Sequence, residues 1–520
     1  MLFNSVEFIF LFLPLSLLIF FTLAKRWGNE IAIAGLVVCS LFFYGWWNPK
    51  YLVLLICSML FNYKVGCRLG KSPNKPLLIF GIAANLLTIA YFKYAGFILQ
   101  NINALSGESW SLSTIILPLA ISFFTFQQIA YLVDSHKGIT KEYSFLHYAL
   151  FVSFFPQLIA GPIVHHKEML PQFTNNQRYR INKTNIEIGL TIFAIGLFKK
   201  TVLADGVAVY ATPVFDLADS GQSIDFFMAW GGSLAYTFQL YFDFSGYSDM
   251  AIGLARLFGI ILPLNFYSPY KAANISEFWR RWHITLSHFL RDYVYIALGG
   301  NRSGKVKRYS NLLITMLLGG LWHGAGWNFI IWGGLHGSYL VINLGWQSIK
   351  NKTHNEFYHT KSYCFIAWFI TFIAVVIGWV FFRATTLSGA MNILAGMIGL
   401  NGMEIPNAIL SKLGTVGQYL TDAGIKQSNG GAVFVFTWLW NIALLVMVLV
   451  LPTIQDLFTH KRGTLNQQNY ESTNTFWPVK SWVNGIQWTN STKWALLSGG
   501  CLALGILTLS QVSEFLYFQF

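Results

Sequence analysis

Charged side chains are scarce in this sequence. Asp, Glu, Lys and Arg make up 11% of its 520 residues, against about 25% in a typical soluble domain. Hydrophobic residues make up 54%, and the mean hydropathy is +0.50. The apolar runs are about 20 residues long, whereas a membrane β-barrel would show short alternating segments. We therefore predict an all-α polytopic membrane protein.

Cysteines and several common catalytic motifs are also missing or rare. The five cysteines stand singly and form neither a CxxC pair nor a zinc spacing, so we expect no disulfide framework and no metal site. A GxxxxGK[ST] loop and a GxSxG elbow are absent, which argues against ATP use and a serine nucleophile. The N-terminus carries Glu7 and no cleavage signal, and we expect it to be a retained first span.

The net charge is strongly positive, at 35 − 21 = +14. In a membrane protein such an excess reflects cytoplasmic loops and contact with anionic lipid. No basic and aromatic nucleic-acid module is visible, so we expect membrane lipid and no nucleic acid among the partners. Lys25 and Arg26 follow the first apolar run, which places that loop in the cytoplasm and the N-terminus outside.

Apolar segments recur along the whole chain. Together with the central stretch Pro269–Gly337 they predict about 10–12 transmembrane helices. The expected spans are 6–24, 31–47, 51–66, 77–99, 114–133, 186–203, 226–242, 363–382, 433–451 and 494–511. We divide the chain into N-terminal transmembrane helices (1–144), a catalytic core with re-entrant segments (145–385), and C-terminal helices with polar loops (386–520).

The segment 145–164 is apolar enough to cross a membrane but has basic loops on both sides. Pro156, Gly161 and Pro162 interrupt any single helix through it. We expect a broken element that enters and leaves on the cytoplasmic face, beside protein or a water-filled cavity. An ordinary span with a weakly specified loop is the alternative.

The central stretch starts with an amphipathic pattern. Apolar residues recur by threes and fours, which predicts one helix beginning at the N-cap Asn274, with Glu277 three residues on. Its apolar positions are Ile275, Phe278, Trp282, Phe289, Tyr293 and Ala297. Arg280, His283 and Arg291 would share another face. An interfacial helix with a solvated basic face is the alternative interpretation.

A histidine stands inside an apolar run further on. Leu312–Leu335 contains no Asp, Glu, Lys or Arg, yet it holds His323 between Gly320 and Gly324. An ionisable group at membrane depth is costly and indicates a functional site, and glycines allow close approach of a ligand or another segment. The alternative is a histidine that joins two helices. For His336, near the end of its segment, that structural role is favoured.

Four motifs carry a resemblance to a known family. They are Phe278–His283 (FWRRWH), Leu321–Gly324 (LWHG), Pro156–Pro162 (PQLIAGP) and Asp243–Asp249 (DFSGYSD). They resemble the membrane-bound O-acyltransferase (MBOAT) family, and its branch of bacterial polysaccharide O-acetyltransferases that includes the alginate O-acetylation membrane subunit. The resemblance covers about residues 1–385. It implies helices, re-entrant segments and interfacial helices around a central tunnel. One departure is His165-His166, where the family has a basic residue.

The resemblance also implies a reaction. An acetyl group would pass from cytosolic acetyl-CoA across the bacterial inner membrane to hydroxyls of an extracytoplasmic polysaccharide (alginate-like, cellulose or peptidoglycan). Transfer would be direct or through a periplasmic SGNH-hydrolase-like partner. By this resemblance His323 is the catalytic histidine and His283 the second motif residue. No cofactor is expected to be bound permanently. D-alanyl transfer to a wall polymer and a transporter or export channel are the alternatives.

Roles follow for the remaining candidate residues. Neutral imidazole suits a general base near pH 7, so we assign that role to His323, with His283 orienting a reactant or polarising the thioester. The expected substrate-binding residues are Trp322, Arg280, Arg281, Asp249, Gly320 and Gly324. The CoA phosphates would meet the basic cluster Arg302, Lys305, Lys307 and Arg308, which the positive-inside rule also explains. For Asp243, Asp249 and Arg256, ion pairing or capping is the favoured role and a cavity wall the alternative.

The depth of His323 can also be estimated. It follows Arg308 by about 15 residues, and a helix rises about 1.5 Å per residue. His323 should therefore lie about 20 Å from the cytoplasmic edge, near the middle of a hydrocarbon layer about 30 Å thick.

Overall fold

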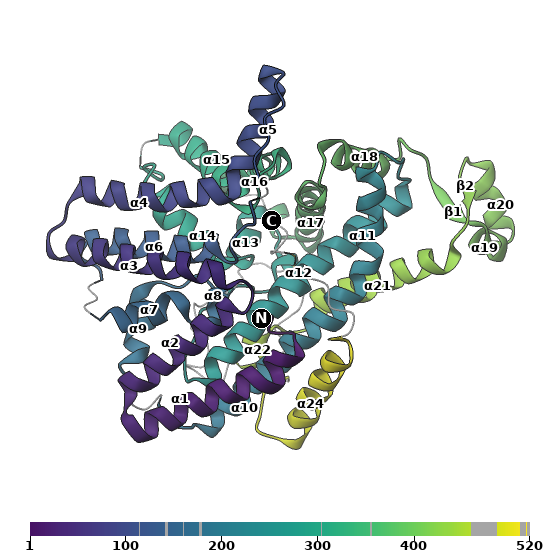
Figure 1. Ribbon diagram of the computed structural model, residues 1–520. Coiled ribbons are helices and arrows are strands. Elements are labelled where there is room, and N and C mark those ends of the chain that lie inside the picture. Colours follow the sequence, from purple (N-terminus) through teal and green to yellow (C-terminus); the bar gives the residue numbers. More distant parts are fainter. Residues whose placement is uncertain are drawn as a thin grey trace.

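The fold is an assembly of helices around one long central helix (Figure 1). The computed structural model describes residues 1–113, 115–140, 144–159, 161–175, 179–302, 304–353, 356–458, 486–509 and 516. Ala160 of the Pro156–Pro162 motif lies outside them. The prediction of an all-α membrane protein is confirmed, with one small two-stranded sheet as an addition.

The N-terminal helices lie close to the predicted ranges. Their bounds are η1 Phe8–Phe12, α1 Leu13–Trp27, α2 Asn29–Gly45, α3 Pro49–Lys71, α4 Lys75–Ile89, η2 Ala90–Tyr94, α5 Ala95–Ser106 and α6 Ile121–His136. Local sequence explains two of these starts. Asn48 and Asn74 accept hydrogen bonds from the first turns of α3 and α4, each followed by a proline.

The middle of the chain contains the broken element that Pro156 and Pro162 predict. The helices here are α7 Phe145–Ser153, α8 Phe155–Leu158, α9 His166–Phe173, α10 Lys183–Phe198, η4 Lys199–Ala204, α11 Asp205–Asp219 and α12 Phe226–Leu257. The chain leaves the helical conformation at Phe154, between α7 and α8. Residues 148–159 are buried, so this irregular backbone is covered by protein. The side on which the segment enters the membrane stays a prediction.

Helix α12 is the spine of the molecule. It is 32 residues long and is buried along most of its length. Glycines bring α10 against it: a Cβ at Gly246 would meet the Gly196 carbonyl oxygen at 2.7 Å, and one at Gly253 would meet the Gly189 carbonyl oxygen at 2.6 Å. Backbones this close leave no room for side chains, so the pairing of α10 and α12 is fixed by glycine.

The central stretch departs from its predicted single helix. Its elements are η5 Pro269–Lys271, α13 Ile275–Arg281, α14 Ile284–Phe289, η6 Leu290–Tyr295, α15 Gly304–His323, α16 Trp327–Thr353, η7 Glu356–His359 and α17 Lys361–Arg383. The Asn274 cap is confirmed, because its side chain accepts from the Glu277 backbone N–H. The continuous helix is wrong: His283 has φ 42°, which ends α13 and starts α14. The spacing of apolar residues cannot reveal such a break.

The C-terminal part contains the small extramembrane element expected at 399–431. Its elements are α18 Leu387–Met397, β1 Glu404–Pro406, α19 Asn407–Leu410, η8 Ser411–Leu413, α20 Thr415–Asp422, β2 Lys426–Ser428, α21 Gly431–Val450, α22 Ile454–Leu457 and α24 Thr492–Leu507. Strands β1 and β2 pair in parallel, with Glu404 opposite Lys426. Figure 1 shows this element protruding at one edge of the molecule.

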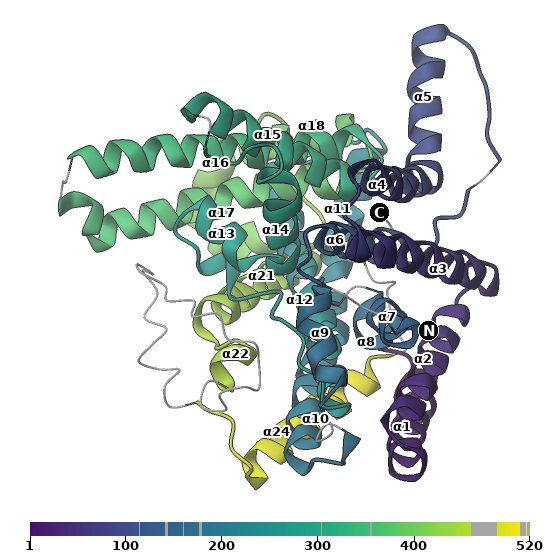
Figure 2. The ribbon, with the colours of Figure 1, turned by 90° about the vertical axis from the view of Figure 1, so that its left-hand side faces the viewer.

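Five helices of the described residues are long and apolar enough to cross a membrane. They are Phe8–Trp27, Pro49–Lys71, Lys75–Ser106, Lys361–Arg383 and Gly431–Val450. Three shorter apolar helices accompany them, at Asn29–Gly45, Leu387–Met397 and Thr492–Leu507. Any larger number of crossings stays a prediction. Figure 2 shows α16 and α17 side by side, extending away from the rest of the helices.

Candidate active site

His323 is the last residue of α15. The chain turns at residues 324–326 and returns as α16, which packs along α15. A Cβ at Gly320 would run into the Phe329 carbonyl oxygen, and one at Gly324 would run into the Phe329 ring. Both glycines are therefore filled against α16. The structure gives them a packing role and does not show them as walls of an open tunnel.

Aromatic rings surround the imidazole of His323. Its centroid lies 4.8 Å from the Trp322 ring, 5.0 Å from Trp332 and 5.1 Å from Phe382. The residue is 5% exposed. Two of these neighbours also present hydrogen-bond donors: the indole N–H groups of Trp322 and Trp332 are buried and have no acceptor within the described ranges. The chamber therefore joins a candidate base to N–H groups that can bind an oxygen of a ligand.

His283 is held by a neutral amide. The Asn265 side-chain oxygen accepts from the Thr285 backbone N–H at 3.3 Å and lies 3.1 Å from His283 Nδ1. Because the backbone N–H fixes that atom as an acceptor, Nδ1 carries the proton and Nε2 the lone pair. Asn265 also accepts from the Thr285 hydroxyl at 3.0 Å. The sequence reasoning missed Asn265, which lies in an irregular loop with no periodic pattern.

The two motif histidines are brought together across Trp322. The Trp322 centroid is 6.2 Å from that of His283 and 4.8 Å from that of His323. Lys93 and His336 also lie within electrostatic range of His323. His336 is fully buried and accepts from the Trp279 indole N–H at 3.2 Å. That bond joins α13 to α16, which fits the structural role favoured for His336.

Lys93 is a second residue that the sequence reasoning missed. Its ammonium group donates to the carbonyl oxygens of Trp322 at 2.6 Å and His323 at 3.0 Å. The neighbouring Tyr94 hydroxyl donates to the Leu321 carbonyl at 2.7 Å. The last carbonyls of a helix have no partner within it and attract a cation. A lysine inside an apolar span was the available signal, because such residues are rare.

The end of α15 lies near the ends of other helices. The Asn328 side chain donates to the Ala384 carbonyl at 2.7 Å, just beyond α17, and the Trp327 indole donates to Asn101 of α5 at 3.0 Å. A 20-residue helix is about 30 Å long, the thickness of a hydrocarbon layer. His323 thus lies at the end of α15 opposite to Gly304, nearer one surface than the expected midpoint.

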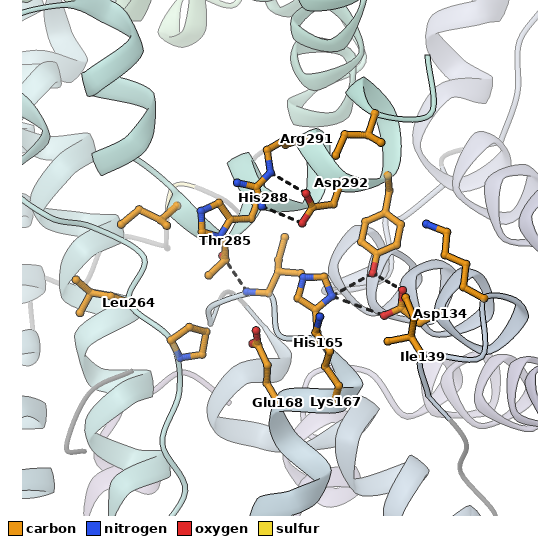
Figure 3. A pocket seen from close by; sticks show the side chains of 16 residues that line it. Asp134, Ile139, His165, Lys167, Glu168, Leu264, Thr285, His288, Arg291 and Asp292 are labelled. Carbon is orange, nitrogen blue, oxygen red and sulfur yellow. Dashed lines mark hydrogen bonds and ion pairs between the residues drawn. The ribbon is translucent and has the colours of Figure 1, made fainter. Parts of the chain in front are cut away.

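A polar cavity of about 380 Å³ opens on the His283 side of this region (Figure 3). Its cations and histidines are Lys137, His165, Lys167, His288 and Arg291, and its carboxylates are Asp134, Glu168 and Asp292. Tyr293 donates to Asp134 at 3.0 Å and lies 3.1 Å from His165. Burial, with Arg291 nearby, lowers the pKa of His288. Sequence reasoning had noted the His165-His166 pair and Arg291 but placed no cavity there.

Two routes of contact lead from the cavity to the histidines. Thr285 lines the cavity and hydrogen-bonds Asn265, which holds His283. Tyr293 also lines it and starts a column of rings that runs through Phe289 and Phe126 to Trp322. The successive centroid distances are 4.9 Å, 4.3 Å and 5.4 Å. The cavity and His323 therefore lie on opposite sides of one layer of aromatic side chains.

The remaining candidate residues lie elsewhere. Asp249 forms an ion pair of 2.6 Å with Lys199, and Arg281 forms one of 2.7 Å with Glu277. Arg280 is exposed. These contacts give Asp249 and Arg281 structural partners, and no contact with ligand follows from them. Asp243 likewise pairs with Lys200, as the structural alternative predicted.

The predicted CoA cluster is separate from the cavity. Arg302, Lys305 and Lys307 are exposed and Arg308 is half-buried, and none of the four lines the polar cavity. Among the described residues no group of three or more His, Cys, Asp or Glu side chains is arranged to hold a metal ion.

Comparisons with known proteins agree with the motifs. A family model for the membrane-bound O-acyltransferase family matches residues 135–387. A peptidoglycan O-acetyltransferase of Helicobacter pylori is 49% identical over 435 residues, covering 78% of this chain and 81% of the relative. A probable alginate O-acetylase of Pseudomonas putida is 41% identical over 537 residues, covering 100% of both. A teichoic acid D-alanyltransferase of Streptococcus thermophilus is 32% identical over 248 residues, 46% of this chain and 59% of the relative.

Proposed function

Because this chain belongs to the membrane-bound O-acyltransferase family, we propose that it moves an acetyl group from cytosolic acetyl-CoA to hydroxyls of an extracytoplasmic polysaccharide. The observation that carries the proposal is the position of His323. It ends a membrane-length helix, in an aromatic chamber with two free indole donors, across a ring layer from a polar cavity. We place the protein in the bacterial inner membrane.

Each chemical step has a residue to perform it. The His323 imidazole accepts the proton of the acceptor hydroxyl while that oxygen attacks the thioester carbonyl. The negative oxygen of the tetrahedral intermediate needs hydrogen-bond donors in a water-poor site, and the indole N–H groups of Trp322 and Trp332 supply them. Collapse breaks the carbon–sulfur bond, the ester leaves with the acetyl group, and the departing thiolate takes the proton from His323. No covalent enzyme intermediate is needed.

The polar cavity of Figure 3 is the proposed entrance for the donor. Lys137, Lys167 and Arg291 offer charges to the phosphates of CoA. They replace the exposed cluster Arg302–Arg308 as the proposed phosphate site, because a cavity can desolvate and orient a ligand. The pantetheine arm would pass the ring layer between the cavity and Trp322. His283, held by Asn265 beside that path, is placed to orient the thioester.

The acceptor is proposed from the relatives and from depth. The relatives that cover most of the chain are named for peptidoglycan and alginate acetylation. His323 near the far end of α15 suits a polymer that stays outside, since the acetyl group and not the cofactor would cross. Final transfer by a periplasmic SGNH-like partner is part of the proposal, because a membrane-embedded donor site can serve a second enzyme as well as a polymer.

D-alanyl transfer is the second candidate, supported by the more distant teichoic acid relatives. The donor distinguishes the two. Purified protein should cleave radiolabelled acetyl-CoA in the presence of alginate or peptidoglycan fragments and label the polymer. A D-alanyl carrier protein should give no labelled product. Turnover of the carrier thioester with no turnover of acetyl-CoA would reverse the assignment, and turnover of neither donor would favour a transporter.

A further inference from the structure

A second hollow lies on the side of the molecule away from the His323 chamber. It is a groove of about 630 Å³ between α13, α16 and α17, within the size range of ligand sites. One face of α16 and one face of α17 form its long walls. Figure 2 shows these two helices extending together beyond the rest of the bundle.

The chemistry of the groove changes along its length. The part nearer the bundle is lined by apolar side chains, among them Ile342, Ile366, Ile370 and Ala374. The far part is aromatic and cationic: the Lys350 ammonium lies 5.6 Å from the Tyr358 ring centre and 5.2 Å from that of Tyr363. A site that is apolar at depth and has a cation among aromatic rings at its mouth matches a lipid with a charged head.

The charge at the mouth selects the kind of head. Lys350, Lys352 and Lys361 gather where α16 ends and α17 begins, and Glu356 opposes them. The other carboxylate of the groove, Glu277, is paired with Arg281 at 2.7 Å. The mouth is thus positive, and basic helix ends of this kind face the cytoplasmic leaflet, where anionic lipids are found.

We propose that this groove binds one anionic phospholipid, with an acyl chain between α16 and α17 and the phosphate at Lys350. The inner wall of the groove is α13, tied to α16 by the bond from Asn343 to Ser276 at 2.7 Å. The same helix carries Trp279, the hydrogen-bond donor to His336. A bound lipid would therefore brace the helix next to the histidine chamber. The proposal is independent of which acyl donor the protein uses.

The test is lipid-dependent stability of the full-length protein in detergent. Phosphatidylglycerol should raise the melting temperature more than phosphatidylethanolamine of the same chains. Lys350→Gln should weaken phosphatidylglycerol binding about fivefold, the effect of one lysine at an anionic surface. Lys350→Arg should restore it. The matched control is Lys412→Gln, an exposed lysine of η8 in the extramembrane element, and it should behave as wild type.

A second variant tests the apolar part. Ala367→Trp fills the groove and should remove the lipid retained in native mass spectrometry, with an unchanged melting temperature in lipid-free detergent. Equal increments for the two headgroups in wild type, or a full phosphatidylglycerol increment in Lys350→Gln, would overturn the proposal. So would a co-purifying membrane peptide in place of lipid that Ala367→Trp releases.

Discussion

Two regions of the molecule bury polar groups in different ways. Around η4 and α12, Lys200 lies 2.7 Å from Asp205 and 2.8 Å from Asp243, and Lys199 lies 2.6 Å from Asp249. In the other region His323 stands among aromatic rings, and His283 is held by the amide of Asn265. The first region matches opposite charges. The second keeps imidazoles beside neutral partners.

The difference separates folding from chemistry. A buried ion pair satisfies its own charges, so it stabilises a helix contact but leaves nothing for a ligand. A histidine among rings keeps a lone pair in a water-poor site, which is what proton transfer requires. The sequence marks both regions in the same way, as ionisable residues in apolar runs. Only the partners distinguish them.

The largest expected effect breaks the second region. Replacing the base, His323→Ala, should lower the rate of polymer acetylation by about 10²- to 10⁴-fold. The melting temperature should change little, since the ring packs at the edge of the chamber and makes no ion pair printed by its geometry with α12. Single-turnover transfer of radiolabelled acetyl measures the rate. His147→Ala, which removes a histidine paired with Glu30 at 3.0 Å, should acetylate normally.

Lys200→Met breaks the first region. It leaves two buried carboxylates without their cation, which should cost about 3–5 kcal/mol of stability. Unfolding in detergent followed by tryptophan fluorescence measures this loss. The protein that remains folded should keep its rate per molecule. A stable but inactive Lys200→Met protein would show that this ion-pair region belongs to the reaction site.

The indole donors sharpen the comparison. Trp332→Phe keeps a ring against His323 but removes one N–H donor, and loss of one oxyanion donor costs about 10²- to 10³-fold in kcat. KM for acetyl-CoA should stay within a factor of about two, because the donor acts in the transition state. A rise in KM at unchanged kcat would instead make Trp332 part of the ground-state binding site.

Lys93 gives the smallest effect. Lys93→Met removes the cation from the Trp322 and His323 carbonyls, and a charge at a helix end contributes up to about 2 kcal/mol, or about 30-fold. We expect kcat to fall by about 3- to 30-fold with rescue by Lys93→Arg. A loss of folding in both variants would make the lysine structural only.

The sequence predicts the helices well and the site only in part. The apolar runs place α1 to α5 and α21 within a few residues, because membrane spans are long and their caps are local. The motif histidines are found because ionisable groups in apolar runs are rare. Asn265 and Lys93 could not be placed, since each acts through backbone far away in the sequence: Lys93 and His323 are 230 residues apart.

The break at His283 shows a second limit. Apolar residues recur with helical spacing on both sides of it, so the pattern predicts one helix, whereas Asn265 stabilises a left-handed turn there. Gly320 and Gly324 show a third. Glycine beside a histidine fits either a tunnel wall or a close helix contact, and the position of Phe329 decides for the contact.

The central claim is that His323 passes an acetyl group between two faces of the membrane. Proteoliposomes of known orientation test it most directly, with radiolabelled acetyl-CoA on the side of Gly304 and polymer, with any required partner, on the other. Wild type should label the polymer, and His323→Ala should not, while both release no acetyl-CoA across the membrane. Label that appears only when donor and polymer share one face would contradict the account.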